Sequence, residues 1–220
     1  MTKEKNISFT QELLRKGIHL ISLSIPVLYI FLDKYTALII LIPLTILAII
    51  IDILSKYQNF VRLILFKYFR HMLRPHETQD KLIFNGATWV LISATICVMI
   101  FPKLLTVVGF TILIISDISA ALIGRLFGKH SLFVNKSLEG TLAFIISAGL
   151  VILLYGIIFS APWTFFLAGI ISAIVGGFAE AISPIIKVDD NLSIPVSVGL
   201  TLWFLGLYAA YIGYPYLNLL

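Results

Sequence analysis

The chain has 220 residues, of which 60% are hydrophobic and 12% are charged, and its mean hydropathy is +1.04. A soluble domain would carry roughly 25% charged residues, so this composition excludes a soluble globular protein and predicts an all-α integral membrane protein. The net charge of +5 comes from basic residues spread over several loops, which is typical of membrane topology and excludes a nucleic-acid-binding surface.

The chain is long enough for a polytopic bundle of about seven transmembrane helices. The predicted spans are Leu20–Leu32, Tyr35–Ile53, Leu82–Phe101, Leu104–Phe127, Leu138–Phe159, Trp163–Pro184 and Val196–Leu217. The first helix is expected to start earlier, near Ser8, where Ser8 and Gln11 fit a capping box. Almost nothing remains for a soluble domain, so residues 1–220 are expected to form a single transmembrane domain.

Charge predicts the orientation of these spans. Basic residues precede the first span and gather between the second and third, the fourth and fifth, and the sixth and seventh, whereas only Lys34 and Lys103 fall on the other side. By the positive-inside rule the N-terminus is cytoplasmic and the C-terminus is outside. The polar clusters of the chain end on the cytoplasmic side. We therefore expect a multi-pass protein of the cell membrane whose active site faces the cytoplasm.

The segment between the second and third spans has a different pattern. Residues 55–74 place an apolar stripe on one side of a helix, basic residues on the other, and Pro75 at its end. This pattern predicts a basic amphipathic helix at the level of the cytoplasmic headgroups. Its role as a simple anchor or as a substrate gate is left open.

The first helix carries the sequence Arg15-Lys16-Gly-Ile-His19, whose polar members share one helical face. Positive flanking of a span explains Arg15 and Lys16 by itself. His19 lies deeper, where an imidazole is able to take a proton from an alcohol.

The fourth span ends in a face of small residues headed by an acid. Asp117, Ala120, Gly124 and Gly128 recur at three- and four-residue spacing, which is also the pattern of a close helix-packing seam. Packing does not explain the acid or the cations that accompany it. Asp117 is predicted to hold Mg²⁺, which takes one or two carboxylates together with phosphate oxygens. The cations predicted to neutralise phosphate charge are Arg125, Lys129 and Lys136.

The fifth span begins with Lys136-Ser137-Leu138-Glu139-Gly140. Ser137 is predicted to cap this helix, and the free amides at its N-terminus suit a phosphate. Gly140 allows close approach of a ligand or of another helix. Glu139 is either a partner of the helix dipole or an acceptor for a hydroxyl proton.

Acidic residues also gather around the connection between the last two spans. Glu180 lies near the end of the sixth span, and Asp189-Asp190-Asn191 precedes the seventh. Asp189 and Asp190 offer adjacent oxygen ligands for Mg²⁺, although Asx-rich turns are also common before helices. Glu180 is a second candidate acceptor for the hydroxyl proton.

Together these motifs resemble the CTP-dependent polyprenol kinase family, which includes dolichol, phytol and farnesol kinases and a CTP-using diacylglycerol kinase. The matching residues run from Arg15-Lys16-Gly-Ile-His19 through Asp117–Lys129 and Lys136–Gly140 to Glu180 and Asp190-Asn191-Leu192-Ser193-Ile194-Pro195. Ser116 stands where the family usually has glycine. The resemblance implies Mg²⁺-dependent transfer of the γ-phosphoryl group of CTP to a lipid alcohol. Nucleotide-binding residues expected on this basis are Arg15, Lys16, Arg125, Gly128, Lys129, Lys136, Ser137, Gly140 and Asn191.

Two other functions remain open at this point. The central block also resembles phosphatidate cytidylyltransferase, but the Lys-Arg and Lys-Asp pairs of that enzyme's C-terminal signature do not occur in this chain. A small transporter would use intramembrane acids for ions, yet no inverted repeat is visible. The identity of the lipid alcohol and the formation of a homodimer are left undecided.

Overall fold

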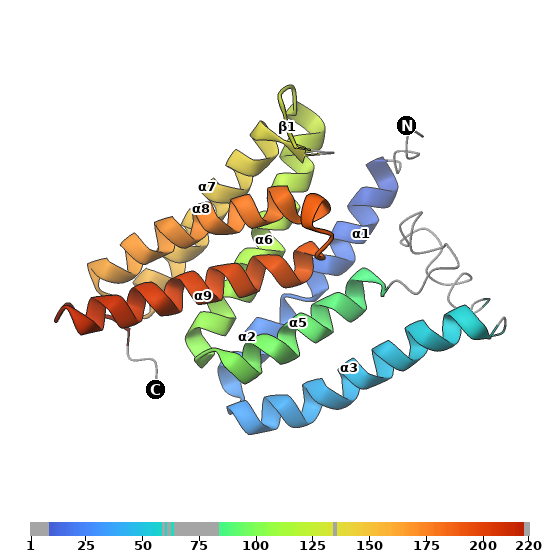
Figure 1. Cartoon of the computed structure of the whole chain (residues 1–220), viewed down its shortest axis with the longest axis horizontal. Coiled ribbons are helices and arrows are strands. Elements are labelled where there is room, and N and C mark those ends of the chain that lie inside the picture. Colours follow the sequence, from blue (N-terminus) through green and yellow to red (C-terminus); the bar gives the residue numbers. More distant parts are fainter. Residues whose placement is uncertain (1–8, 59, 61–62, 64–83, 134–135, 218–220) are drawn as a thin grey trace.

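The computed structural model describes residues 9–58, 60, 63, 84–133 and 136–217, and these form a helical bundle with one small two-stranded sheet (Figure 1). The elements in chain order are α1 (Phe9–Ile21), α2 (Ser24–Phe31), α3 (Lys34–Tyr57), α5 (Gly86–Ile100), α6 (Lys103–Phe127), β1 (Ser131–Phe133), β2 (Lys136–Ser137), α7 (Leu138–Ile158), α8 (Trp163–Ile186) and α9 (Asp190–Tyr211). The all-α membrane fold predicted from composition is confirmed.

Within the described residues, six stretches are long and apolar enough to cross a membrane: Leu13–Phe31, which joins α1 and α2, and helices α3, α6, α7, α8 and α9. Helix α5 is also apolar but has only 15 residues, or about 22 Å of helix, against a hydrocarbon layer of about 30 Å. The third predicted span was expected to begin at Leu82, which lies outside the described residues. Six candidate spans and one shorter apolar helix thus correspond to the seven predicted spans.

The first span was predicted as one helix, and the structure corrects this to two. Helix α1 ends at Ile21 and α2 begins at Ser24, with the N–H of Ser22 donating to the carbonyl of His19 at 3.0 Å. Pro26 supplies the reason, because it has no N–H to donate to the carbonyl of Ser22 and its ring crowds that carbonyl. The break allows α1 to take its own direction against α6.

Helices α5, α7 and α9 begin at the same end of the bundle, and each starts at a side-chain cap (Figure 1). Asn85 and Ser137 accept from the backbone N–H three residues further on, at 2.9 and 3.1 Å, and Asp189 accepts from the N–H two residues further on, at 3.0 Å. The caps satisfy amides that would otherwise lack partners in the first turns. The predicted cap at Ser137 is confirmed.

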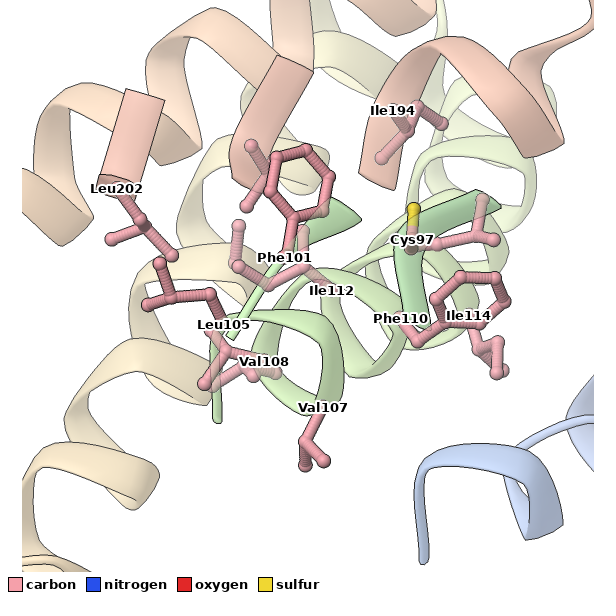
Figure 2. Packing of buried hydrophobic residues seen from close by; sticks show 14 of the residues in the cluster. Cys97, Phe101, Leu105, Val107, Val108, Phe110, Ile112, Ile114, Ile194 and Leu202 are labelled. Carbon is pink, nitrogen blue, oxygen red and sulfur yellow. The ribbon is translucent and has the colours of Figure 1, made fainter. Parts of the chain in front are cut away.

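Helix α6 runs through the centre of the bundle and contacts α1, α2, α5, α7 and α9. Its span is 61% buried, compared with 22% for the span in α3. In Figure 2, Phe110 and Ile112 of α6 lie among Cys97 of α5 and Ile194 and Leu202 of α9, all of which are buried. A helix that is apolar on every side belongs in such a core, and this one carries Asp117 toward the end where α1 begins.

The second predicted span ends later than expected. Helix α3 continues to Tyr57, where the N–H of Gln58 donates to the carbonyl of Leu54 at 2.8 Å. Residues 55–57 therefore extend α3 instead of opening the predicted amphipathic helix. Most of residues 55–74 lie outside the described residues, so the interfacial placement of that helix stays a prediction.

The start of α1 and the end of α9 lie at opposite ends of the bundle (Figure 1). This arrangement agrees with the predicted odd number of crossings. The assignment of the α1 end to the cytoplasm stays a prediction.

Candidate active site

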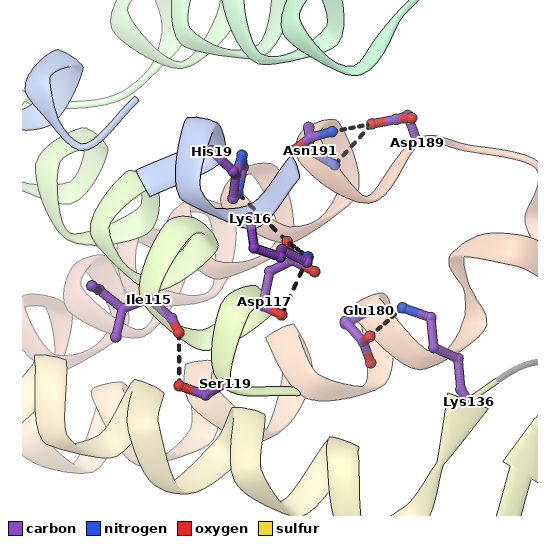
Figure 3. Close-up of polar contacts among 9 residues, drawn as sticks. All are labelled: Lys16, His19, Ile115, Asp117, Ser119, Lys136, Glu180, Asp189 and Asn191. Atoms are coloured by element: carbon purple, nitrogen blue, oxygen red, sulfur yellow. Dashed lines mark hydrogen bonds and ion pairs between the residues drawn. The ribbon is translucent and has the colours of Figure 1, made fainter. Parts of the chain in front are cut away.

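Charged side chains from distant parts of the chain lie close together (Figure 3), toward the end of the bundle where α1 begins (Figure 1). Lys16 of α1 pairs with Asp117 of α6, and Lys136 of β2 pairs with Glu180 of α8. Asp190 at the start of α9 acts electrostatically on Lys136 and Glu180. The structure thus brings together members of all four predicted motifs.

Asp117 is the centre of the first pair and is only 5% exposed. The ammonium group of Lys16 donates to Oδ2 of Asp117 and lies 3.4 Å from its backbone carbonyl oxygen. Nε2 of His19 lies 3.5 Å from the same Oδ2. The predicted shared face of the first helix is therefore confirmed for Lys16 and His19, which both face the acid.

The second pair joins the connection between α6 and α7 to the end of α8. β1 pairs antiparallel with β2, a small sheet that the sequence analysis did not predict, and β2 carries Lys136 to the carboxylate of Glu180. Burial by itself would lower the pKa of Lys136, but the carboxylates of Glu180, Asp190 and Asp117 more than offset it and hold the pKa above its ordinary value. Lys136 is therefore a fixed positive charge at neutral pH.

The start of α9 closes a third side of the site. Oδ1 of Asp189 accepts from both the backbone N–H and the side-chain amide of Asn191, at 3.0 and 2.7 Å. Asn191 is buried, and the charge of the intervening Asp190 acts on His19 as well as on Lys136. This turn therefore links the two ion pairs.

The remaining predicted cations are placed differently. Arg15 is half-buried next to Lys16, and its charge acts on His19. Arg125 and Lys129 are exposed at the end of α6 and just beyond it. Their predicted contact with phosphate groups stays a prediction.

Glu139 is engaged at the edge of the site. Its Oε1 lies 2.7 Å from Nδ1 of His130 and 3.2 Å from the backbone N of His130, which donates to it. The His130 side chain is 73% exposed. These contacts hold the loop between α6 and α7 in place, and the predicted role of Glu139 as a proton acceptor stays untested.

The small-residue face of α6 forms a close contact with α7. A Cβ atom added to Gly124 would lie 3.3 Å from the Cα of Gly140, and one added to Gly140 would lie 2.9 Å from the carbonyl oxygen of Ala120. A Cβ on Gly128 would meet Oγ of Ser137 at 2.8 Å. These glycines therefore bring the two backbones together, as the packing interpretation of the motif predicted. The predicted nucleotide contacts of Gly128 and Gly140 stay predictions.

The acids suit a magnesium–nucleotide complex in their chemistry. No group of three or more His, Cys, Asp or Glu side chains that could hold a metal occurs among the residues that the structure describes. Mg²⁺ with a nucleotide needs only one or two carboxylates, because phosphate oxygens and water supply the other ligands. Asp117, with Asp189 or Asp190, remains the predicted set.

One polar contact near the site was not assigned from sequence. Asp52 of α3 is buried and accepts from the backbone N–H of Asn85 at 2.9 Å. Asn85 is followed by Gly86, and a Cβ atom on Gly86 would lie 3.8 Å from Nδ2 of Asn191. The signals were an acid inside a span and an Asn directly before an apolar run.

Comparison with known proteins gives two relatives. The chain is 30% identical over 194 residues to the uncharacterized protein RP860 of Rickettsia prowazekii (strain Madrid E). The matched segment covers 88% of this chain and 94% of that protein. The chain belongs to the same family as that protein. No protein-family model matches the chain, and no solved structure matches it at a significant level.

The second relative has a described activity. The chain is 30% identical over 128 residues to CTP-dependent diacylglycerol kinase 1 of Schizosaccharomyces pombe. The matched segment covers 53% of this chain and spans 58% of the length of that kinase.

Proposed function

We propose that this protein is a CTP-dependent kinase that transfers the γ-phosphoryl group to the hydroxyl of a membrane lipid alcohol of the polyprenol, phytol, farnesol or diacylglycerol type. The observation that carries the proposal is the convergence of two lysine–carboxylate pairs with buried carboxylates, Lys16–Asp117 and Lys136–Glu180, at one end of a membrane bundle. The partial similarity to a CTP-dependent diacylglycerol kinase supports it.

These lysines can exchange their carboxylate partners for the phosphate groups of a nucleotide. Each lysine is held by a carboxylate, so the free protein has no uncompensated charge at these positions. A triphosphate offers the lysines new anionic partners. Asp117 with Asp189 or Asp190 would hold the Mg²⁺ that accompanies the nucleotide, and this ion would supply further neutralisation of phosphate charge. Lys16 and Lys136 thus orient the phosphates and stabilise charge during transfer.

The transfer itself requires little beyond positioning and charge. The lipid hydroxyl oxygen bonds to the γ-phosphorus as the bond from that phosphorus to the β–γ bridging oxygen breaks, and CDP leaves. The hydroxyl proton passes to a nearby base. His19 and Glu180 lie in the cluster, where Glu180 pairs with Lys136, whereas Glu139 contacts His130 at the edge of the site.

The lipid alcohol approaches from the membrane. Leu13, Leu14, Leu20 and Ile21 of α1 are 48–69% exposed, whereas Lys16 of the same helix is buried. Helix α1 therefore offers an apolar outer face beside the charged site, which suits a lipid chain whose hydroxyl reaches inward.

A product assay tests the proposal. Purified protein in detergent is incubated with γ-labelled CTP, Mg²⁺ and, in separate reactions, phytol, farnesol, a polyprenol, diacylglycerol and phosphatidate. We expect label in an organic-phase lipid phosphate and CDP in the aqueous phase. Labelled pyrophosphate formed with phosphatidate alone would identify a cytidylyltransferase instead, and the absence of both products would reject nucleotide chemistry.

The same assay tests the metal ligands. Asp117→Asn and Asp190→Asn should each reduce phosphoryl transfer and weaken its dependence on Mg²⁺ concentration. If both variants kept wild-type transfer, the metal assignment would be wrong even if the kinase activity were established.

A further inference from the structure

Asp52 is a buried acid that the proposed phosphoryl transfer does not use. It lies within the span formed by α3 and is 5% exposed. Ionisable groups inside membrane spans are costly and usually have a function. The contacts of Asp52 indicate what this function is.

Both carboxylate oxygens of Asp52 bind the same residue. Oδ2 accepts from the backbone N–H of Asn85 at 2.9 Å, and Oδ1 accepts from its side-chain amide at 2.5 Å. Oδ1 of Asn85 in turn accepts from the N–H of Thr88 at 2.9 Å, which caps α5. The amide of Asn85 thus has a donor contact on one side and an acceptor contact on the other, which fixes its orientation.

The short length of α5 gives a physical reason for this contact. A helix of 15 residues covers only about 22 Å, so its first turn can lie within the apolar layer, where backbone groups need partners from the protein. Asp52 and Asn85 provide such partners. Asp52 therefore connects the start of α5 to α3.

This first turn reaches the candidate site. A Cβ atom on Gly86 would lie 3.8 Å from Nδ2 of Asn191. Asn191 is bound by Asp189 and follows Asp190, whose charge acts on Lys136. A shift of the start of α5 would therefore displace Asn191 in the α9 turn that links the two ion pairs.

We propose that Asp52 and Asn85 form a positioning unit that holds the first turn of α5 against Asn191. This unit fixes the position of Asn191 on the side of the site where the nucleotide is proposed to bind. This inference rests on the proposed kinase function. Neither side chain is required to touch the nucleotide, so Asp52 is a positioning residue and not a catalytic one.

The test compares Asp52→Asn with Thr45→Val. Thr45 makes a separate polar contact between α3 and α5, with its hydroxyl 3.2 Å from the carbonyl oxygen of Leu91 and 2.8 Å from Oγ1 of Thr95. Asp52→Asn should lower kcat/KM for CTP by about 10- to 100-fold, as expected for a small displacement of a binding group, with the KM for the lipid alcohol unchanged. Thr45→Val should leave both parameters at wild-type values.

A second readout does not depend on activity. In a Cys97→Ala background, cysteines introduced as Gly86→Cys and Asn191→Cys should be joined rapidly by a short bifunctional crosslinker, and adding Asp52→Asn should slow this reaction. An unchanged crosslinking rate would overturn the inference. So would equal kinetic effects of Asp52→Asn and Thr45→Val, or an equal rise in the KM values for CTP and lipid. If the wild-type protein transferred no phosphate, the proposed function would fail and the crosslinking rate alone would decide the position of α5.

Discussion

At the scale of single residues, the site depends on lysines that pair with buried carboxylates. Lys16 and Asp117 are 6% and 5% exposed, and Glu180 is 3% exposed. Removing one member of a buried pair leaves an uncompensated charge, which typically costs about 3–5 kcal/mol. The two pairs are therefore sensitive positions for both stability and activity.

Replacing Lys136 tests its predicted contribution to activity. If the proposed function is correct, Lys136→Gln should lower kcat/KM for CTP by about 100- to 1,000-fold, because a charge that stabilises the transferring phosphate would be lost. Lys187→Gln is the matched control, since Lys187 is exposed at the end of the same helix that carries Glu180. Comparable activity losses in the two variants would argue against a specific role for Lys136.

The Lys136–Glu180 pair also predicts how the stability of the protein depends on pH. The pKa of Lys136 is raised in the folded protein, so its stabilisation is complete below the unfolded-state pKa of about 10.4 and is lost as the pH rises through the folded-state pKa. The difference in unfolding temperature between wild type and Lys136→Gln should stay constant from neutral pH to about pH 10 and then shrink. A difference that shrank between pH 7 and 9 would contradict this prediction.

At the scale of elements, the contact between Gly124 and Gly140 fixes how closely α6 and α7 approach each other. Lys136 directly precedes α7, so this contact also influences its position. A Cβ on Gly140 would meet backbone atoms, the Ala120 carbonyl oxygen at 2.9 Å and the Gly124 Cα at 3.2 Å. Backbone atoms cannot turn aside as a flexible side chain can. Any side chain at Gly140 must therefore separate the helices.

Gly140→Ala should destabilise the protein by about 1–3 kcal/mol through this overpacking. Gly149→Ala on the same helix is the matched control, because a Cβ there meets nothing within 4 Å, and alanine favours a helix over glycine by up to about 1 kcal/mol. Thermal unfolding in detergent should show a lower midpoint for the first variant and an equal or higher midpoint for the second. Equal midpoints would mean that the α6–α7 contact adapts without cost.

At the scale of the whole molecule, the charged site occupies one end of the bundle, while the end of α9 lies at the other (Figure 1). Arg125, Lys129 and Lys136, in and around the connection between α6 and α7, lie at the site end, so the positive-inside rule predicts that this end faces the cytoplasm. A kinase that draws CTP from the cytosol requires this orientation.

Cysteine labelling tests the orientation. In a Cys97→Ala background, Ser131→Cys places a thiol at the site end and Ser160→Cys places one in the connection between α7 and α8 at the other end, both at exposed positions. In sealed right-side-out vesicles, a membrane-impermeant maleimide should label the second variant, and the first only after permeabilisation. The reverse pattern would place the site outside.

Much of the fold and of the site was predictable because the relevant forces are local. Apolar length marks a span, and Ser137 before an apolar run marks a helix start, since each depends only on neighbouring residues. The break at Ser22–Leu23 was also encoded locally, by Pro26, but was not recognised. The small sheet at β1 and β2 gave no periodic signal because it is so short.

The sequence by itself determined the class of protein and its apolar segments, and it named the residues proposed for the site, because hydropathy and motif spacing are properties of neighbouring residues. Only the tertiary structure decided the partners. Lys16 meets Asp117 across 101 positions, Lys136 meets Glu180 across 44, and Asp52 meets Asn85 across 33. Such pairs form only when the helices pack, and the distance between their axes depends on side-chain volumes at the contacts. The glycine contact between α6 and α7 and the break at Ser22–Leu23 are two features of this packing.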